Sequence, residues 1–248
     1  MTTRILPVLA LLLACDADSV PPPNIAAAAE VNGSEQQRRE VLTKVRPITT
    51  RAGHPRFTDP VLRDPLAAGV FAERLADASV AEAERVALAE ALPRCGGAWA
   101  DVALTRLAIE EDPAVRAVLI GGLQRATDAQ ALAGARAGLA DADANVRRAA
   151  AELAGWVPAV GKALSGELQV ALADGAAEVR AAATRAIGLT GDSSAFDAVA
   201  RGLKDGDPQV RLEAVRSIKR IDAGRAKPAL VALQDDADSR VQRAARSE

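Results

Sequence analysis

The sequence predicts an all-α protein, an α-solenoid built from about six helical pairs. The first observation behind this prediction is a short phrase that contains a basic residue and recurs along most of the chain. Its copies are centred on Arg85, Arg116, Arg147, Arg180, Arg211 and, in the last copy, Gln242. Successive copies are separated by 31, 31, 33, 31 and 31 residues, and a period between about 20 and 50 residues is typical of repeat architectures.

The second observation is that each phrase begins like a helix. The clearest copy reads DGDPQVRLEA at residues 205–214, and residues 141–150 read DADANVRRAA. A short carboxylate accepts hydrogen bonds from the free amides of a first turn, and proline is tolerated at the first helical position. The residues expected to cap helices are Asp112, Asp143, Asp207 and Asp238, with Pro113 and Pro208 following two of them.

The third observation is a second apolar segment upstream of each phrase. These segments end in leucine, at Leu75, Leu107, Leu139, Leu172, Leu203 and Leu233. Each unit is therefore expected to be a pair of helices joined to the next pair by an acidic turn. One pair cannot bury its apolar face alone, and stacking neighbouring pairs closes the core.

The pattern D-x-D-x-x-V-R-x-x-A at this period resembles the short HEAT-like repeats named from phycobilisome lyases. The resemblance covers roughly residues 66–248. It implies a ladder of hydrogen bonds between neighbouring repeats, with Asp143/Arg147 and Asp207/Arg211 as rungs. Two departures from the family pattern are Ala176, at the position of a capping aspartate, and Gln242, at the position of the arginine. The family is a scaffold used for many tasks, so the fold by itself says little about function.

The first residues have a different character and predict a signal peptide at residues 1–14. Arg4 precedes an apolar run that is too short to span a bilayer, and the run ends in the sequence LLAC at residues 12–15. This sequence resembles the lipobox of bacterial lipoproteins, which implies lipid attachment at Cys15. The predicted localisation is the bacterial cell envelope, lipid-anchored, with inner and outer membrane both open. The alternative is an ordinary cleaved signal with a chance cysteine near its end.

Residues 15–60 are interpreted as the lipidated N-terminus and a flexible, disordered tether. Pro21–Pro23 are expected to form a stiff extended stretch, and Ser34 with Gln37 has the spacing of a capping box at a short helix. An open alternative is that residues 35–45 dock on the first repeat as a cap. The HEAT-like repeat domain is expected at 61–248, with pairs at 61–94, 95–125, 126–157, 158–190, 191–221 and 222–248.

The repeats contain none of the residue sets expected of a metal site or a histidine-dependent catalytic site, and we interpret the protein as one that is not an enzyme. The single histidine, His54, lies in the tether, so no metal site and no histidine-dependent catalytic set is expected in the repeats. The same absence excludes the iron-binding deoxyhypusine hydroxylases among HEAT-like proteins. No cofactor is expected. The formal net charge of −2 removes the usual electrostatic driving force for nucleic-acid binding.

Cys95 and the few aromatic residues have two interpretations each. Cys95 is favoured as a small buried residue at a helix end, and the alternative is a thiol that carries a ligand, as in a lyase-like protein. Aromatic residues make up only 2% of the chain, so Trp99 and Trp156 are expected to fill gaps in an alanine-rich core. The alternative is that Trp156 is exposed and anchors a partner.

The function predicted from the sequence is a membrane-anchored scaffold that binds a protein or peptide in the periplasm or at the cell surface. Charged residues on the second helices, off the apolar stripe, are the candidates for contact with the partner. They are Arg148, Glu152, Arg185, Glu213, Arg216 and Arg220. The alternatives are a lyase-like protein that handles a ligand or chromophore, and a nucleic-acid-binding solenoid, which the balanced charge opposes.

Overall fold

The computed structural model describes residues 36–37, 39–41, 43, 60–77 and 79–247. The predicted signal peptide, Cys15, Ser34 and His54 lie outside these residues, as does most of the predicted tether. The described residues between 36 and 43 are helical, and Val41 is buried. No helix in the described part of the chain has the length and apolar character needed to cross a membrane.

The prediction of an all-α solenoid of helical pairs is confirmed. Residues 60–247, where described, form helices and turns without strands, and they divide into six pairs at the expected boundaries. The first helices of the pairs are α4 (Ala67–Ala76), α6 (Trp99–Leu107), α8 (Asp128–Leu139), α10 (Pro158–Ala163) with α11 (Ser165–Ala171), α13 (Phe196–Arg201) and α15 (Ala223–Leu230). The second helices are α5 (Glu82–Ala91), α7 (Pro113–Gly122), α9 (Ala144–Trp156), α12 (Ala177–Thr190), α14 (Pro208–Ile221) and α16 (Ser239–Arg246).

Short 3-10 turns complete the pairs. They are η1 (Pro60–Arg63), η2 (Leu92–Arg94), η3 (Leu123–Arg125), η4 (Ser193–Ala195), η5 (Gly202–Lys204) and η6 (Val231–Asp235). The helices form two compact units, Met1–Gly134 and Ala135–Glu248, with the division inside α8. In the first unit, the residues of the core with no or almost no exposed surface are Leu62, Phe71, Leu75, Leu88, Leu92, Leu119, Ile120 and Leu123.

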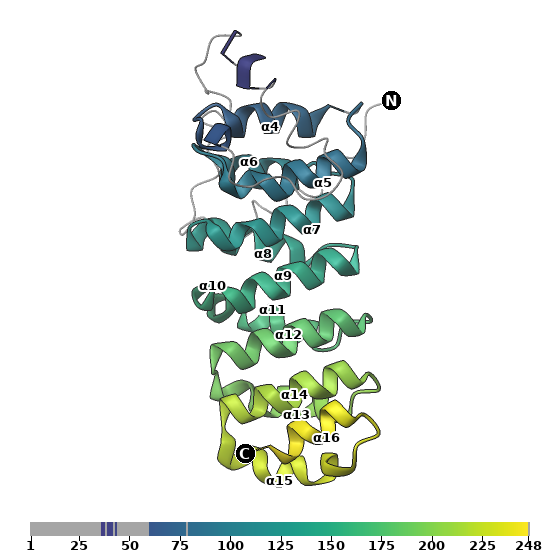
Figure 1. Cartoon of the computed structure of the whole chain (residues 1–248). Helices are drawn as coiled ribbons and strands as arrows, with labels where there is room; N and C mark the ends of the chain where they lie inside the picture. Colours follow the sequence, from purple (N-terminus) through teal and green to yellow (C-terminus); the bar gives the residue numbers. More distant parts are fainter. Residues whose placement is uncertain (1–35, 38, 42, 44–59, 78, 248) are drawn as a thin grey trace, which may run out of the picture. The chain divides into compact units, whose positions relative to one another are not determined.

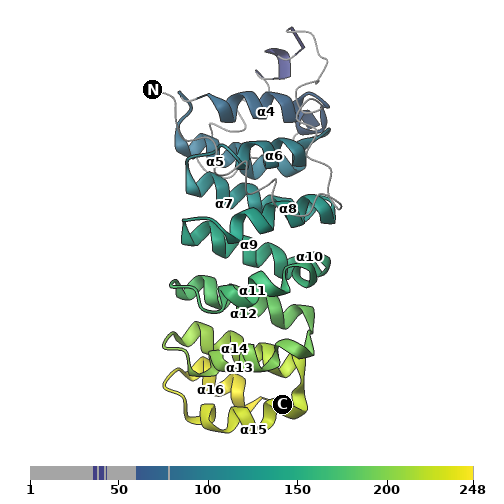
Figure 2. The ribbon, with the colours of Figure 1, turned by 180° about the vertical axis from the view of Figure 1, so that it is seen from behind.

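The second unit packs through small residues, which let its second helices approach closely. A Cβ built on Gly188 of α12 would lie 2.3 Å from the hydroxyl oxygen of Ser217 on α14. That hydroxyl is buried and donates to the backbone carbonyl of Thr184 at 3.0 Å. Gly155 of α9 likewise lies against Ala186 of α12. Helices α12 and α14 accordingly lie side by side, as both views show (Figures 1 and 2).

The expected helix caps are present. The side chains of Asp112, Asp143, Asp207 and Asp238 each accept a hydrogen bond from a backbone amide at the start of α7, α9, α14 and α16. Helices α5 and α12 have no such cap, because Ala81 and Ala176 stand at their N-termini and provide no side-chain acceptor; in α12 the alanine replaces the aspartate of the repeat. The backbone angles of Ala176, φ −90° and ψ 126°, are nevertheless those of a capping residue.

Candidate partner-binding surface

A ladder of arginine–aspartate pairs joins neighbouring repeats in the second unit. Arg180 of α12 grips Asp205, in the turn before α14, through two hydrogen bonds of 2.8 Å from Nε and Nη2. Its remaining nitrogen, Nη1, donates to the backbone carbonyls of Asp174 and Gly175 in its own turn. Each guanidinium therefore fixes two successive turns. The same arrangement joins Arg147 to Asp174 and Arg211 to Asp236.

The acidic partners in this ladder differ from the predicted ones. Asp143 and Asp207, predicted as rungs, instead cap α9 and α14. The carboxylates on the rungs lie two residues before the capping position, and Asp205 also accepts the backbone amide of Asp207 at 2.9 Å. The two aspartates of the turns at residues 205–207 and 236–238 thus have separate tasks: the first accepts the arginine of the preceding repeat, and the second caps the helix that follows.

The bonded arginines shift the titration of the rung carboxylates. Hydrogen bonds from Arg180 lower the pKa of Asp205 below its ordinary value, and burial opposes the shift only in part. Arg147 and Arg211 lower the pKa of Asp174 and Asp236 in the same way. The rungs are therefore charged pairs at neutral pH.

Gln242 retains one half of the arginine's bonding. Its amide nitrogen Nε2 donates to the backbone carbonyl of Asp236 at 2.6 Å, as Nη1 of Arg211 does to Asp205 one repeat earlier. A glutamine has no second donor pair to grip the carboxylate of a following turn. The substitution therefore preserves the turn within its own repeat.

The first unit has a variant of the rung that the sequence pattern does not reveal. Arg85 donates to the capping residue Asp112 at 3.1 Å, and it lies 3.8 Å from Glu110. Glu110 occupies the position of the rung aspartate, is buried, and accepts a 2.7 Å hydrogen bond from Nε of Arg106. The longer side chain of glutamate turns back to its own helix pair, so the arginine pairs with the cap instead.

Three of the six predicted contact residues form one ion-paired cluster on α9 and α12. Glu152 accepts hydrogen bonds from Arg148 at 2.9 Å and from Arg185 at 3.2 Å. All three side chains are about one-third exposed. The cluster joins two neighbouring second helices and carries one unbalanced positive charge towards solvent.

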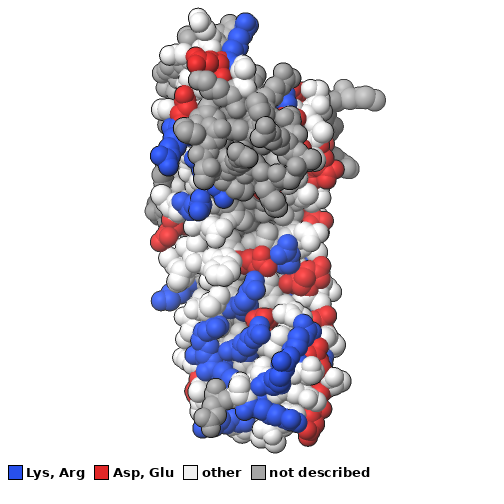
Figure 3. All heavy atoms as spheres, in the orientation of Figure 1, with Lys and Arg blue, Asp and Glu red and all other residues white. Residues whose placement is uncertain are grey.

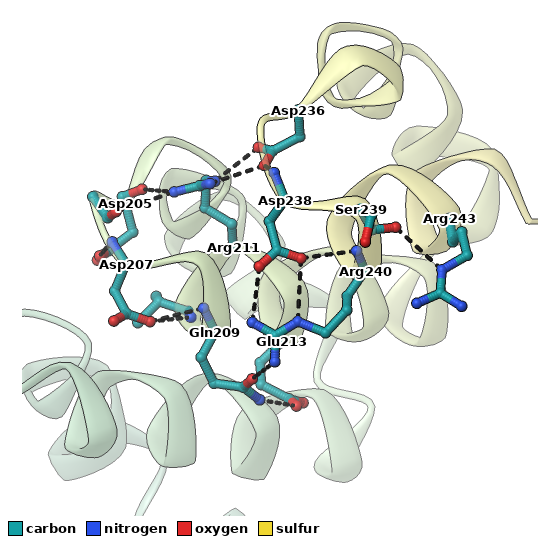
Figure 4. Close-up of polar contacts among 12 residues, drawn as sticks. Asp205, Asp207, Gln209, Arg211, Glu213, Asp236, Asp238, Ser239, Arg240 and Arg243 are labelled. Carbon is teal, nitrogen blue, oxygen red and sulfur yellow. Dashed lines mark hydrogen bonds and ion pairs between the residues drawn. The ribbon is translucent and has the colours of Figure 1, made fainter.

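The other three predicted contact residues, on α14, have different surroundings. Glu213 is only 5% exposed, so the prediction that its side chain faces a partner does not fit its burial. It accepts hydrogen bonds from Gln209 at 3.1 Å and from Arg216 at 3.0 Å. Gln209 in turn accepts from Arg240 of α16, which is paired with Asp238 (Figure 4). Arg220 is exposed and makes no hydrogen bond or ion pair with the described residues.

Two exposed apolar side chains lie on the same helices. Trp156, at the end of α9, is 66% exposed, which corrects the expectation that it fills the core. Leu189 of α12 is 39% exposed, and its side chain lies against Gly155, next to Trp156 in the chain. Among the other aromatic residues that the structure describes, Phe71 and Phe196 are buried and Trp99 is half-buried.

Counting from the rung arginines shows that these residues occupy repeated positions. The fifth residue after Arg147, Arg180 and Arg211 is Glu152, Arg185 and Arg216, and the ninth is Trp156, Leu189 and Arg220. Positions four apart in a helix lie on one face, one turn from each other. We call this pair of rows on α9, α12 and α14 the second-helix face. No signal in the pattern of apolar residues distinguishes Trp156 from a core residue.

Other candidate chemistry is not supported by the geometry. Cys95 is buried next to η2, and burial raises the pKa of its thiol to about 12. The thiol is therefore protonated and shielded at neutral pH. Gly96 and Gly97 form a close turn against η1, where a Cβ on Gly96 would lie 2.8 Å from the carbonyl oxygen of Arg63. No group of histidine, cysteine or acidic side chains among the described residues is arranged to hold a metal ion.

Comparisons with known proteins agree with this architecture. Residues 164–248 match the sequence model of HEAT repeats. No curated protein sequence matches the chain. The complex of CpcE and CpcF of phycocyanin lyase from Nostoc sp. is similar with a TM-score of 0.52 and 20% identity, over 79% of this chain and 79% of that chain. The YIBA protein of Escherichia coli is similar with a TM-score of 0.57 and 17% identity, over 84% of this chain and 94% of that one.

The first of these structures corrects the prediction that the protein is not an enzyme. The prediction rested on the absence of histidine from the repeats and on the single thiol. A phycocyanin lyase has the same fold, so those absences do not exclude enzymatic activity in a helical-repeat protein. The chain is thus an α-solenoid in fold and is similar to HEAT repeats in sequence over residues 164–248.

Proposed function

We propose that this protein is a scaffold that binds a protein or peptide, and that the second-helix face of its second unit holds the partner. The observation that carries the proposal is Trp156, whose side chain is 66% exposed. Tryptophan is enriched among the residues that contribute most to protein interfaces. Leu189 occupies the same position on the next second helix, is 39% exposed, and lies against Gly155, the residue before Trp156 in the chain.

The charged residues around these two side chains are held in place before any partner arrives. Arg148 and Arg185 are fixed by their shared carboxylate, Glu152, and Arg216 is held by the buried Glu213. A surface with fewer free side-chain rotamers loses less conformational entropy when it binds. Glu213 is buried and does not contact the partner itself; it holds Arg216 in position for that contact.

Complex formation is already known for one protein with this fold. The lyase subunits CpcE and CpcF form a complex with each other. This supports the view that stacked helical pairs present surfaces for other chains, although each solenoid carries its own residues on that surface.

The proposed setting is the bacterial cell envelope, with the chain anchored by acyl groups on Cys15 and its partner in the periplasm or at the cell surface. This part rests on the sequence LLAC at residues 12–15. Several acyl chains anchor a protein stably to a membrane. An intact mass of protein extracted from host membranes tests it: a chain beginning at Cys15 with added acyl mass is expected, and an unmodified full-length chain would refute it.

The binding proposal is tested by isolating the protein with its partners from the native host. Trp156→Ala is expected to reduce recovery of the specific partner about thirtyfold or more, because truncating a central aromatic residue costs about 2 kcal/mol or more. The matched control is Val170→Ala on α11, since Val170 is an exposed apolar residue (76%) on a first helix. Equal recovery with both variants would contradict the assignment of the second-helix face.

A further inference from the structure

Charge is unevenly distributed within the second unit, although the whole chain is nearly balanced with 31 basic and 33 acidic residues. Helices α14 and α16 carry seven basic residues and one acidic residue, the buried Glu213. Most of the neighbouring aspartates lie in the turns before these helices, where they serve as rungs and caps. The basic side chains gather over α12, α14 and α16 in the lower part of Figure 3.

The two helices lie side by side and run in the same direction. Near their starts, Arg240 of α16 donates to Gln209 of α14 at 3.3 Å. Near their ends, Nζ of Lys219 on α14 donates to the carbonyl of Ala244 on α16 at 2.5 Å, and also to the carbonyl of Ser247. Lys219 therefore caps the C-terminus of α16, where the helix dipole favours a cation.

Two of the seven cations, Arg220 and Arg243, are exposed without a carboxylate partner among the described residues, and a third, Arg216, is exposed although it is ion-paired. Arg220 has no partner among the described residues, and Arg243 bonds only to the backbone carbonyl of Ser239 in its own helix. Arg216 is paired with Glu213, yet its side chain is 54% exposed. On α14, Arg216 and Arg220 are four residues apart and share a face. Arg220 follows Lys219 in the sequence, and Arg243 precedes Ala244. Lys219 and Ala244 are themselves joined by a hydrogen bond between the two helices.

We infer that Arg216, Arg220 and Arg243 form a cationic site for an acidic segment of the partner protein, next to the apolar pair Trp156 and Leu189. This inference rests on the proposed function and specifies the chemistry of the partner. Carboxylates fit the site because guanidinium groups bind them through paired hydrogen bonds. A nucleic acid fits less well, because the acidic turns adjoin the site and two apolar side chains share the same face.

The positions of these residues set the order of groups in the segment. Trp156, Leu189 and Arg220 occupy the same position on three successive second helices. Neighbouring helix axes are roughly 8–10 Å apart, and an extended chain advances about 3.3 Å per residue. One step between helices therefore corresponds to about three residues. The partner segment has apolar residues about three apart, and its carboxylates begin about three residues beyond them.

Fluorescein-labelled peptides test this order and charge directly. The probes are LSSLSSEEE and its reversed order EEESSLSSL, with twins in which glutamine or lysine replaces every glutamate, measured by fluorescence anisotropy against the full chain. At least one glutamate peptide is expected to bind roughly tenfold more tightly than its glutamine twin, from two or three exposed ion pairs. The difference is expected to shrink as salt rises, because exposed charges are screened over about 10 Å at 0.1 M salt.

Charge reversal locates the site. The variant Arg220→Glu with Arg243→Glu is expected to lose the tenfold preference and to favour the lysine peptide. The matched control is Arg201→Glu with Lys204→Glu, which reverses two exposed cations on α13 and η5 and is expected to leave the preference unchanged. None of the four substituted side chains bonds to another helix among the described residues. Both variants are therefore expected to fold, which their circular dichroism checks.

The outcomes separate this inference from the proposed function. Equal affinity for glutamate and glutamine peptides would overturn the acidic site, as would the absence of binding by every peptide or tighter binding of a decathymidine oligonucleotide. In each of these cases the proposed function still stands if Trp156→Ala releases the native partner and Val170→Ala does not. If neither variant affects the native partner, the proposed function fails, whatever the peptides do.

Discussion

The rung between Arg180 and Asp205 offers a quantitative test of how the repeats are joined. Arg180→Ala removes two hydrogen bonds to Asp205 and two to the carbonyls of its own turn. Breaking a buried ion pair costs about 3–5 kcal/mol, but these side chains are 19% and 15% exposed and partly screened. We therefore expect a loss of about 2 kcal/mol in the free energy of unfolding.

A glutamine substitution, based on Gln242, separates the free energy of the bonds to Asp205 from that of the bonds to the carbonyls of the arginine's own turn. Arg180→Gln retains a donor for the carbonyls of its own turn, as Gln242 does, and loses the grip on Asp205. It is expected to cost about 1 kcal/mol less than the alanine substitution, the usual net value of one hydrogen bond. Urea unfolding of the full chain, followed by circular dichroism, measures both variants.

A double-mutant cycle with Asp205→Asn isolates the pair itself. We expect a coupling energy of about 1–2 kcal/mol at pH 7, within the range for residues in one network. The pKa of Asp205 is lowered in the folded chain, so this stabilisation is present above the unfolded pKa of about 3.9 and is lost as pH falls through the folded pKa. A coupling near zero at pH 7, or one that does not fall as the pH is lowered below the unfolded pKa, would refute the ladder as a stabilising device.

Three further predictions follow from single positions. Ala176→Asp is expected to stabilise the protein by about 1 kcal/mol in urea unfolding, since it supplies the cap that α12 lacks; no gain would contradict this. Gly188→Ala is expected to destabilise it by about 1–3 kcal/mol, because the new Cβ meets Ser217, whereas Gly175→Ala, with open space around it, changes little. Cys95 is expected to react with iodoacetamide far more slowly in the native chain than in urea, because its thiol is buried with a pKa of about 12; equal rates would refute its burial.

The sequence predicted the fold well because its repeat signals are local. An aspartate cap begins four of the six second helices and a proline follows it in two, while apolar residues at helical spacing continue each helix; all of these signals can be recognised without reference to the rest of the chain. The pair boundaries therefore agree with the structure, and the uncapped start of α12 could be predicted from Ala176 alone. The ladder arginines were also identified by their period.

The exposed surface could not be predicted in the same way, because it depends on which neighbours cover each side chain. Trp156 continues the apolar pattern of α9, yet its side chain is 66% exposed in the folded chain. Glu213 appears solvent-facing in the sequence, but it occupies a buried position that α9 and α12 fill with Ala149 and Ala182. The resemblance assigned the rung to the second aspartate of a turn, whereas the first aspartate accepts the arginine. The two could not be told apart from the sequence, because both lie only a few residues before an arginine.

Site-specific photo-crosslinking in the native host tests the central claim most directly. A photoreactive phenylalanine analogue at position 156 lies on the second-helix face, and the same analogue at position 170 lies on a first helix. The account predicts a discrete crosslinked protein adduct from position 156 that the charge-reversed variant Arg220→Glu with Arg243→Glu weakens, and no such adduct from position 170. The same adduct from both positions, or none from position 156, would contradict a binding site on the second-helix face.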